Sequence, residues 1–149
     1  MAQVTFTYKY SIEVQNIPNC PASGMQNIQA APIVAYRFCS SDLNELNNRL
    51  PAARLTPSRE LKGTPITTIC SAFALSMYDS LGNLTNKARS ALKSNPQYLK
   101  RIGDHYIEVR ITQADGKCTI PNTSGHFDFF EYQGFNIITA IISHQVLPI

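Results

Sequence analysis

The chain has 149 residues, 44% of them hydrophobic and 15% charged, which fits one compact domain rather than two. Its low charge excludes disorder driven by like-charge repulsion, and no apolar run approaches the roughly 18 residues of a membrane-spanning helix. Residues 1–10 alternate in polarity and lack the apolar block of a secretory signal. We therefore expect a single soluble globular domain over residues 1–149, in the cytoplasm and without a membrane partner.

The first elements follow from alternation and turn residues. Residues 4–14 alternate strictly between apolar and polar side chains, which predicts a long strand with one buried face. Residues 16–32 contain prolines and little periodicity, and predict a loop. Residues 33–39 are rich in β-formers and predict a central strand. A short helix is expected over 42–50, closed by Pro51 and followed by a mobile surface connection over 51–64.

The middle of the chain contains the clearest helix. Residues 66–78 fit either a helix or a strand, although 71–78 can be drawn as an alternating strand. Leu81, Leu84 and Ala88 recur at helical spacing, and Asn95 and Pro96 break that helix. A second short helical turn is expected from Pro96 to Gly103.

The last third of the chain predicts a sheet. Strands are expected over 105–112, over 117–120 as a short hairpin arm that pairs back, over 126–132 and over 135–146. The last of these is apolar on both faces, which favours an interior position. The expected fold is α+β: a mainly antiparallel sheet of about five or six strands with two or three short helices.

Cysteine and histidine spacings match no familiar metal-ligand pattern, so we expect no metal site. With no secretory signal, free and mostly buried thiols in a reducing compartment are favoured over two disulfides. His105, His126 and His144 are each expected to be hydrogen-bonded structural residues. The glycine-rich, nucleophile-elbow and HExxH motifs of common enzyme classes are absent from the sequence.

One stretch of the chain is strongly basic. Residues 87–101 contain five basic residues and no acidic one, which is typical of a solvated helix face or of a surface that binds anionic partners. These residues are Lys87, Arg89, Lys93, Lys100 and Arg101. Only Tyr98 adds an aromatic ring, so a nucleic-acid-binding domain is the weaker alternative.

Arg37 and Glu131 each lie within an otherwise apolar strand pattern. A buried guanidinium needs a partner, and alternation places Glu131 on the more apolar face, with Phe127 and Phe129. The structural interpretation is an Arg37–Glu131 ion pair. The functional interpretation is a ligand site lined by Arg37, His126 and Glu131.

The order Arg37, Ser76, Glu131, on an early strand, a middle strand end and a late strand, resembles that of the mono-ADP-ribosyltransferases. The resemblance implies that Arg37 contacts the dinucleotide NAD, Ser76 supports the pocket, and Glu131 stabilises the positive charge that develops on ribose. The sequence departs from the family at Ala74-Leu-Ser76, where a Ser-Thr-Ser tract is usual, and at Phe129, where a second Glu or Gln is usual.

These patterns support three hypotheses about function. The leading one is a small binding module without catalytic activity or cofactor, which acts with a larger protein partner through the basic residues of 87–101 and His126. The first alternative is an NAD-dependent transferase or NAD glycohydrolase that uses Arg37, Ser76 and Glu131. The second alternative is a weakly basic domain that binds nucleic acid.

Overall fold

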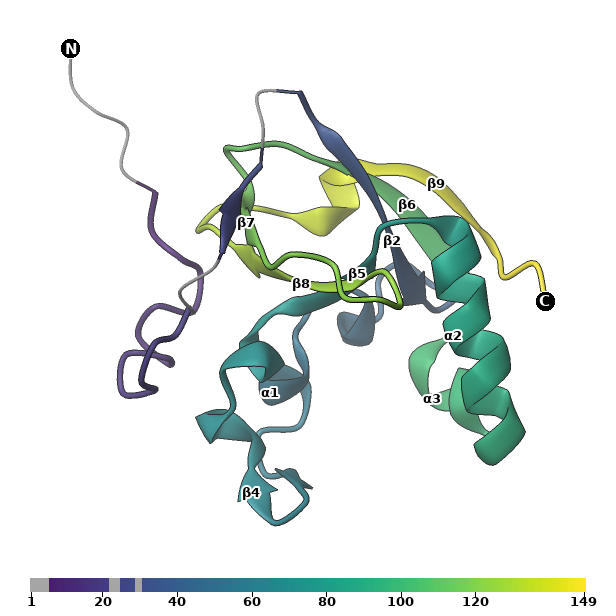
Figure 1. Ribbon diagram of the computed structural model, residues 1–149, viewed down its shortest axis with the longest axis horizontal. Helices are drawn as coiled ribbons and strands as arrows, with labels where there is room; N and C mark the ends of the chain where they lie inside the picture. Colours follow the sequence, from purple (N-terminus) through teal and green to yellow (C-terminus); the bar gives the residue numbers. More distant parts are fainter. Residues whose placement is uncertain (1–5, 22–24, 29–30) are drawn as a thin grey trace.

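The computed structural model describes residues 6–21, 25–28 and 31–149 (Figure 1). Its main feature is a seven-stranded antiparallel sheet in the order β1-β7-β8-β5-β2-β6-β9. The strands are β1 (Gln26–Asn27), β2 (Ile33–Cys39), β5 (Leu75–Tyr78), β6 (His105–Ile111), β7 (Gly116–Cys118), β8 (His126–Glu131) and β9 (Ile141–Val146). A separate two-stranded sheet pairs β3 (Glu60–Leu61) with β4 (Thr64–Pro65).

The helices are short apart from one. The α-helices are α1 (Ala52–Leu55), α2 (Leu81–Ser94) and α3 (Tyr98–Ile102), and the 3-10 turns are η1 (Leu46–Asn48), η2 (Ile66–Thr68), η3 (Cys70–Phe73) and η4 (Ile137–Ala140). This arrangement confirms the α+β class and the antiparallel sheet, with more strands than the five or six expected.

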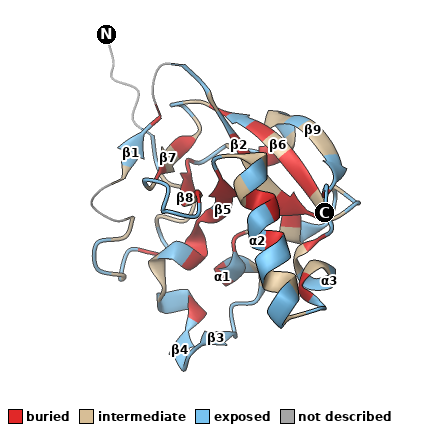
Figure 2. Cartoon of the chain, turned by 45° about the vertical axis from the view of Figure 1, so that its right-hand side comes forward, coloured by how far each residue is buried: buried red, intermediate tan, exposed pale blue. Residues whose placement is uncertain are grey.

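Helix α2 forms where the sequence predicts it. Ser80 is its N-cap, and the Ser80 hydroxyl accepts a hydrogen bond from the Asn83 backbone N–H at 3.1 Å. Leu84 and Ala88 are fully buried against the sheet, while the polar side of the helix faces solvent (Figure 2). Asn95 ends the helix before Pro96, as expected.

Helix α3 ends at a glycine that the fold requires. Gly103 has a φ of 108°, which L residues with a side chain rarely adopt, and a Cβ atom there would collide with the backbone carbonyl of Cys39. This close approach fixes α3 against the end of β2.

Apolar side chains form a core on each face of the large sheet. On one face Ala35, Leu75, Met77 and Val109 pack in a cluster with Phe127, Phe129 and Ile137. On the opposite face Phe38, Tyr78 and Tyr106 pack beneath α2 and α3. The fold therefore has the sheet as a middle layer, with its longest helix on one side (Figures 1 and 2).

The predicted strand over residues 4–14 is wrong for the part that the structure describes. Tyr8 makes one isolated bridge to Tyr132, and residues 9–15 form successive turns; residues 4 and 5 lie outside the described ranges. The Val14 N–H donates to Tyr10 O, so these two apolar side chains pack together as in a helical turn. Ile12 is 74% exposed, which shows that the alternation does not mark a buried strand face.

The end of the chain also differs from the expectation. Residues 135–146 do not form one interior strand, because η4 precedes β9, and β9 lies at the edge of the sheet. Ile142 and Val146 are 50% and 64% exposed. The apolar residues of 135–140 pack onto one face of the sheet instead of forming a strand within it. Hydrophobic content alone does not distinguish these two arrangements.

Two shorter predictions are corrected as well. The arm after Gly116 does not pair back onto β6, because β7 lies between β8 and β1. The expected helix over 42–50 is reduced to η1, and Pro51 precedes α1 instead of only closing the segment. The ambiguous 66–78 segment contains both 3-10 turns and a strand, since η2 and η3 lead directly into β5.

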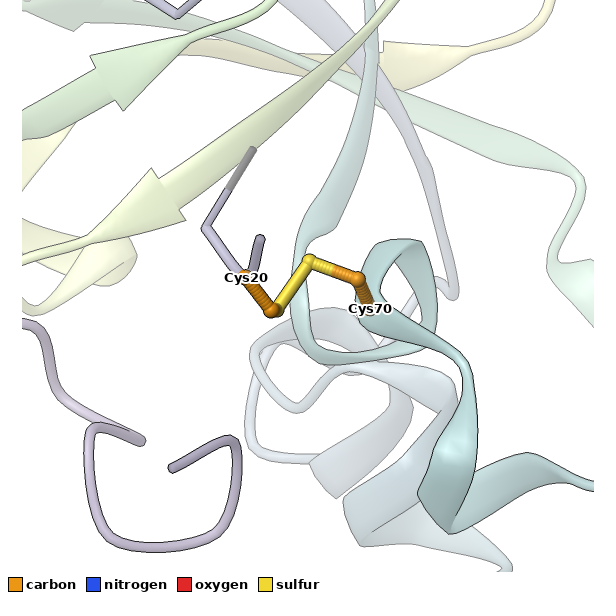
Figure 3. The surroundings of a disulfide bond; sticks show 2 residues. All are labelled: Cys20 and Cys70. Atoms are coloured by element: carbon orange, nitrogen blue, oxygen red, sulfur yellow. A yellow bond between two sulfur atoms is a disulfide. The ribbon is translucent and has the colours of Figure 1, made fainter. Parts of the chain in front are cut away.

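A disulfide joins Cys20 to Cys70, so the prediction of free thiols is wrong for this pair (Figure 3). The bond ties the N-terminal segment to η3, beside a third core that contains Val14, Ala53 and Phe73. Cys39 and Cys118 are free and buried, as expected, and burial raises the pKa of both thiols, that of Cys39 to about 12. Among the described residues, no helix combines the length and apolar character needed to cross a membrane.

Candidate functional site

The described part of the chain forms a cleft of about 1120 Å³, here named the basic cleft. Its walls come from β2, residues 47–59, residues 71–78, α2, α3 and the turn before β8. Its charged and ring-bearing lining residues are Arg37, Phe38, Arg59, Tyr78, Lys87, Tyr98, Arg101 and His126. Within the described chain no aspartate or glutamate lines this cleft, so it favours an anionic ligand.

Arg37 lies where the large sheet opens between two strands. β2 and β5 share a single register pair, Tyr36 with Tyr78, and beyond it the strands separate. The Arg37 guanidinium crosses this opening and donates to Ser76 O at 2.9 Å, Asn48 O at 3.1 Å and Asn47 O at 3.3 Å. A guanidinium has five N–H donors, so two remain for a ligand.

Two of these carbonyls, Asn47 O and Asn48 O, belong to the segment after β2 and accept from Arg37 instead of from a following helical turn, which fits the single 3-10 turn formed there. Burial lowers the pKa of Arg37 to about 10, and the charge of Glu131 opposes that shift. Arg37 therefore stays charged at neutral pH.

Ser76 and His126 meet on the floor of the cleft. Ser76 Oγ lies 2.6 Å from His126 Nε2, on neighbouring strands β5 and β8. Asp128 is paired with Ser76 in the strand register, and its Oδ1 lies 3.9 Å from the same Nε2. Burial raises the pKa of Asp128, and the nearby His126 opposes that rise. Asp128 thus places a carboxylate beside the His126 imidazole, although it is not among the residues that line the cleft.

The turn before β8 fixes the position of His126. The Asn122 side-chain oxygen accepts hydrogen bonds from the backbone N–H groups of Ser124 and His126, at 2.9 and 3.0 Å. Gly125 has a φ of 79° and is packed against Asp79 and Asn83 at the start of α2. The imidazole ring also packs edge-on against Tyr78, with ring centroids 5.4 Å apart. Asn122 and Tyr78 line the cleft although no sequence pattern predicted a site role for either residue.

The basic stretch over 87–101 divides between two surfaces. Lys87 on α2 and Arg101 on α3 line the basic cleft, whereas Arg89, Lys93 and Lys100 do not. Arg89 donates to Pro148 O, and the Arg101 guanidinium lies 5.9 Å from the ring centroid of Tyr98. Because residues of a helix share a face only at spacings of three or four, only part of this run of charge can line the cleft.

Glu131 lies on the opposite face of β8 from His126 and Asp128, and the predicted Arg37–Glu131 ion pair is not formed. Its partner is Lys9, whose Nζ lies 2.7 Å from Glu131 Oε1 and also donates to Phe135 O. The second carboxylate oxygen, Oε2, is buried without a hydrogen-bond partner among the described residues. Burial raises the pKa of Glu131, and Lys9 and Arg37 oppose that rise. The predicted apolar face is confirmed by Phe127 and Phe129 in the core.

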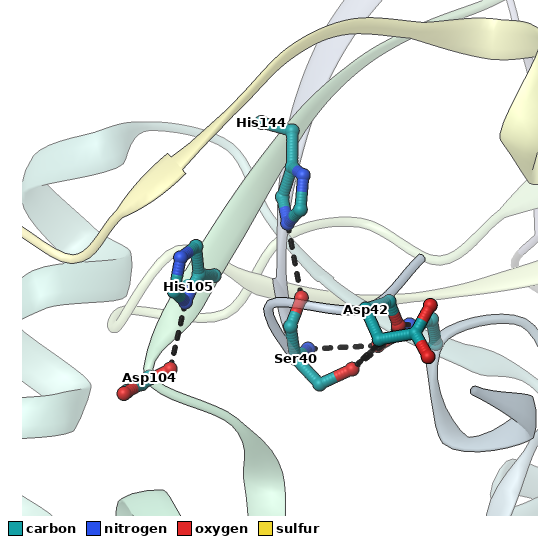
Figure 4. Close-up of polar contacts among 6 residues, drawn as sticks. Ser40, Asp42, Asp104, His105 and His144 are labelled. Carbon is teal, nitrogen blue, oxygen red and sulfur yellow. Dashed lines mark hydrogen bonds and ion pairs between the residues drawn. The ribbon is translucent and has the colours of Figure 1, made fainter. Parts of the chain in front are cut away.

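The other two histidines have structural partners, as the sequence predicts. His144 Nε2 lies 2.9 Å from Ser40 O, and His105 Nδ1 lies 2.7 Å from Asp104 Oδ1 (Figure 4). Their rings pack at a centroid distance of 5.2 Å, which ties β9 to β6. In the part of the chain that the structure describes, no group of three or more His, Cys, Asp and Glu side chains forms a metal-binding cluster.

Comparisons of the chain with protein-family models, with curated proteins and with solved structures each found no match. The candidate site therefore rests on its own geometry. The sequence-predicted residues Arg37, Ser76, His126, Lys87 and Arg101 share one cleft. Glu131, Arg89, Lys93 and Lys100 lie outside it.

Proposed function

We propose that this domain is a binding module whose basic cleft takes a phosphate-bearing ligand of the nucleotide class. The observation that carries the proposal is the charge of the lining: Arg37, Arg59, Lys87 and Arg101 face one concavity that no carboxylate of the described chain lines. Guanidinium groups favour phosphate because they donate paired N–H groups to its oxygens.

The size and the rings of the cleft favour a nucleotide over a free phosphate ion. Typical ligand pockets measure about 300–1000 Å³, and this cleft, at about 1120 Å³, has room for a base, a sugar and phosphates. The largely buried rings of Phe38, Tyr78 and Tyr98 contribute apolar surface to the cleft wall, which a base can contact. The larger protein partner expected from the sequence remains a prediction, and a phosphate group carried by such a partner would suit the same residues.

Calorimetric titration tests this proposal with ADP, inorganic pyrophosphate and adenosine as separate ligands. We expect ADP to bind, pyrophosphate to bind more weakly, and adenosine to bind weakest because it has no charge for the guanidinium groups to meet. Equal affinity for ADP and adenosine, or no binding of ADP, would refute a phosphate-binding cleft.

A second candidate, cleavage of NAD, is favoured by the neighbouring positions of Arg37 and Ser76. Both line the cleft from adjacent strands β2 and β5, and β8 follows β5 in the sheet. The resemblance to the mono-ADP-ribosyltransferases, which rests on the order of these residues along the chain, assigns both to the NAD pocket. The carboxylate differs, because Asp128 is opposite Ser76 and Glu131 is on the other face. In this reaction the bond between ribose and nicotinamide breaks, nicotinamide leaves with the electron pair, and Asp128 stabilises the positive charge on ribose. The oxygen of an acceptor hydroxyl or of water then bonds to ribose and releases its proton to solvent.

Paired variants separate this candidate from simple binding. We expect nicotinamide release from NAD by the wild-type protein and by Glu131→Gln, and its loss in Asp128→Asn. Loss of nicotinamide release in Glu131→Gln but not in Asp128→Asn would show that Glu131, not Asp128, stabilises the charge on ribose. If the wild-type protein releases no nicotinamide in the presence of a cell lysate, the transferase and glycohydrolase hypotheses are both refuted.

A further inference from the structure

Ser76 and His126 form the closest pair of side chains with nucleophile and base chemistry in the basic cleft. The Ser76 hydroxyl oxygen lies 2.6 Å from His126 Nε2, and the serine is exposed to solvent on the cleft side of β5. A hydroxyl in contact with an imidazole nitrogen is the arrangement that converts a serine into a nucleophile. An exposed position gives a bound ligand access to the oxygen.

Hydrogen bonds and ring packing hold both Ser76 and His126 in place. Arg37 donates to the backbone carbonyl of Ser76 at 2.9 Å, which fixes β5 at this residue. Asn122 accepts from the His126 backbone N–H, and Tyr78 packs against the edge of the imidazole. These contacts hold the serine oxygen and the imidazole nitrogen in place next to each other, and such fixed positions favour proton transfer.

We propose that Ser76 is a nucleophile and His126 its general base, and that the pair hydrolyses phosphate monoesters bound in the basic cleft. The substrate class in this inference rests on the proposed function, whereas the nucleophile does not. The histidine acts as the tautomer with its proton on Nδ1, so that Nε2 accepts the hydrogen bond from Oγ.

The reaction proceeds in two balanced steps. In the first, the proton of Oγ moves to Nε2, Oγ bonds to phosphorus, and the bond from phosphorus to the leaving alcohol oxygen breaks. That oxygen takes the proton from Nε2 and leaves as the alcohol. In the second, Nε2 takes a proton from water, the hydroxide attacks phosphorus, and the serine oxygen leaves and regains the proton, which releases inorganic phosphate.

The charges around the pair suit this sequence. Asp128 Oδ1, at 3.9 Å from Nε2, stabilises the imidazolium that forms in each step. Lys87 and Arg101 belong to the same cleft and oppose the negative charge on the phosphoryl oxygens.

A fluorophosphonate probe tests the nucleophile without knowledge of the natural ligand. Activated serines attack the probe at phosphorus and release fluoride, which leaves a stable adduct that mass spectrometry locates. The variants are Ser76→Ala and His126→Gln, and Ser71→Ala is the matched control. Ser71 is exposed in the same cleft, and its hydroxyl makes no hydrogen bond within the described chain.

We expect an adduct on Ser76 in the wild-type protein and in Ser71→Ala, none in Ser76→Ala, and labelling about a hundredfold slower in His126→Gln with an unchanged melting temperature. A wild-type protein that is not labelled, or that is labelled on Ser71, would overturn the inference whatever the variants do. ADP titration of the same samples separates the two proposals: an adduct without ADP binding upholds the nucleophile and refutes the ligand class, and ADP binding without an adduct does the reverse.

Discussion

Lys9 forms an ion pair with Glu131 at 2.7 Å, although the two residues are 122 positions apart in the chain. The Glu131 side chain is 1% exposed and that of Lys9 27%, so the carboxylate is buried and the ammonium group closes its site from the surface. The same ammonium group also donates to Phe135 O. Lys9 therefore ties the turns of the N-terminal segment to the end of β8.

Removing Lys9 should lower the stability of the protein more than removing the charge of Glu131. Lys9→Met leaves a buried carboxylate without a counter-charge, and we expect a loss of about 1–3 kcal/mol, below the full cost of breaking a buried pair because Lys9 is partly exposed. Glu131→Gln removes the buried charge itself and should cost less. Urea unfolding of both variants measures the difference, and an equal or larger loss in Glu131→Gln would show that Lys9 does not compensate the carboxylate.

The same carboxylate predicts how stability depends on pH. Burial raises the pKa of Glu131 above its ordinary value of 4.5, so the folded protein holds this proton more tightly than the unfolded chain does. The contribution of this group to stability should therefore be largest below pH 4.5 and should fall as the pH rises through its pKa in the folded state. The difference between the free energies of unfolding of the wild-type protein and Glu131→Gln, measured over a range of pH, isolates the contribution of Glu131. A contribution that grows as the pH rises would contradict this prediction.

The disulfide should make a measurable contribution to stability. It joins residues 50 positions apart, and a cross-link of this span restricts the unfolded chain, for which we expect a loss of about 2–4 kcal/mol on removal. The paired variant Cys20→Ser with Cys70→Ser is compared with Cys39→Ser, which removes a buried thiol but no cross-link. A reductant should lower the melting temperature of the wild-type protein and leave that of the paired variant unchanged. A wild-type melting temperature that ignores the reductant would argue against the bond.

Charge reversal within the basic stretch should weaken nucleotide binding at the two positions that line the cleft and not at two positions outside it. Lys87→Glu and Arg101→Glu alter residues that line the cleft, so each should reduce ADP affinity at least tenfold, about 1.4 kcal/mol. Lys93→Glu and Lys100→Glu make the same change in net charge outside the cleft and serve as matched controls. Equal losses from all four variants would indicate a diffuse effect of net charge rather than a site.

The sequence predicts the fold best where a pattern is compatible with only one kind of secondary structure. Helix α2 combines an N-cap, a helical apolar spacing and a proline stop, and it forms as expected. Alternation over 4–14 and the apolar run over 135–146 each predicted one long strand, but turns and surface-covering segments satisfy the same patterns. Ile12 and Ile142, both largely exposed, show where pattern alone fails.

The candidate site was predictable in part for a similar reason. Arg37 stood out as a charge within an apolar strand, and the structure places it in the cleft with Ser76. Its partners are backbone carbonyls, which no side-chain pattern can reveal. Lys9 gave no signal as the partner of Glu131, because their contact depends on how the N-terminal turns fold over β8. The Ser76–His126 contact depends on the register of β5 against β8, which lies beyond local sequence.

The most direct test of the account is to map where ADP binds by following backbone amide signals in a nuclear magnetic resonance titration. We predict that the largest shifts cluster at Ser76, Arg101 and His126, around the basic cleft, and that β9 and the surroundings of Lys93 stay unchanged. Shifts centred on Lys93 and Lys100, or no shifts at all, would contradict the assignment of the basic cleft as the ligand site.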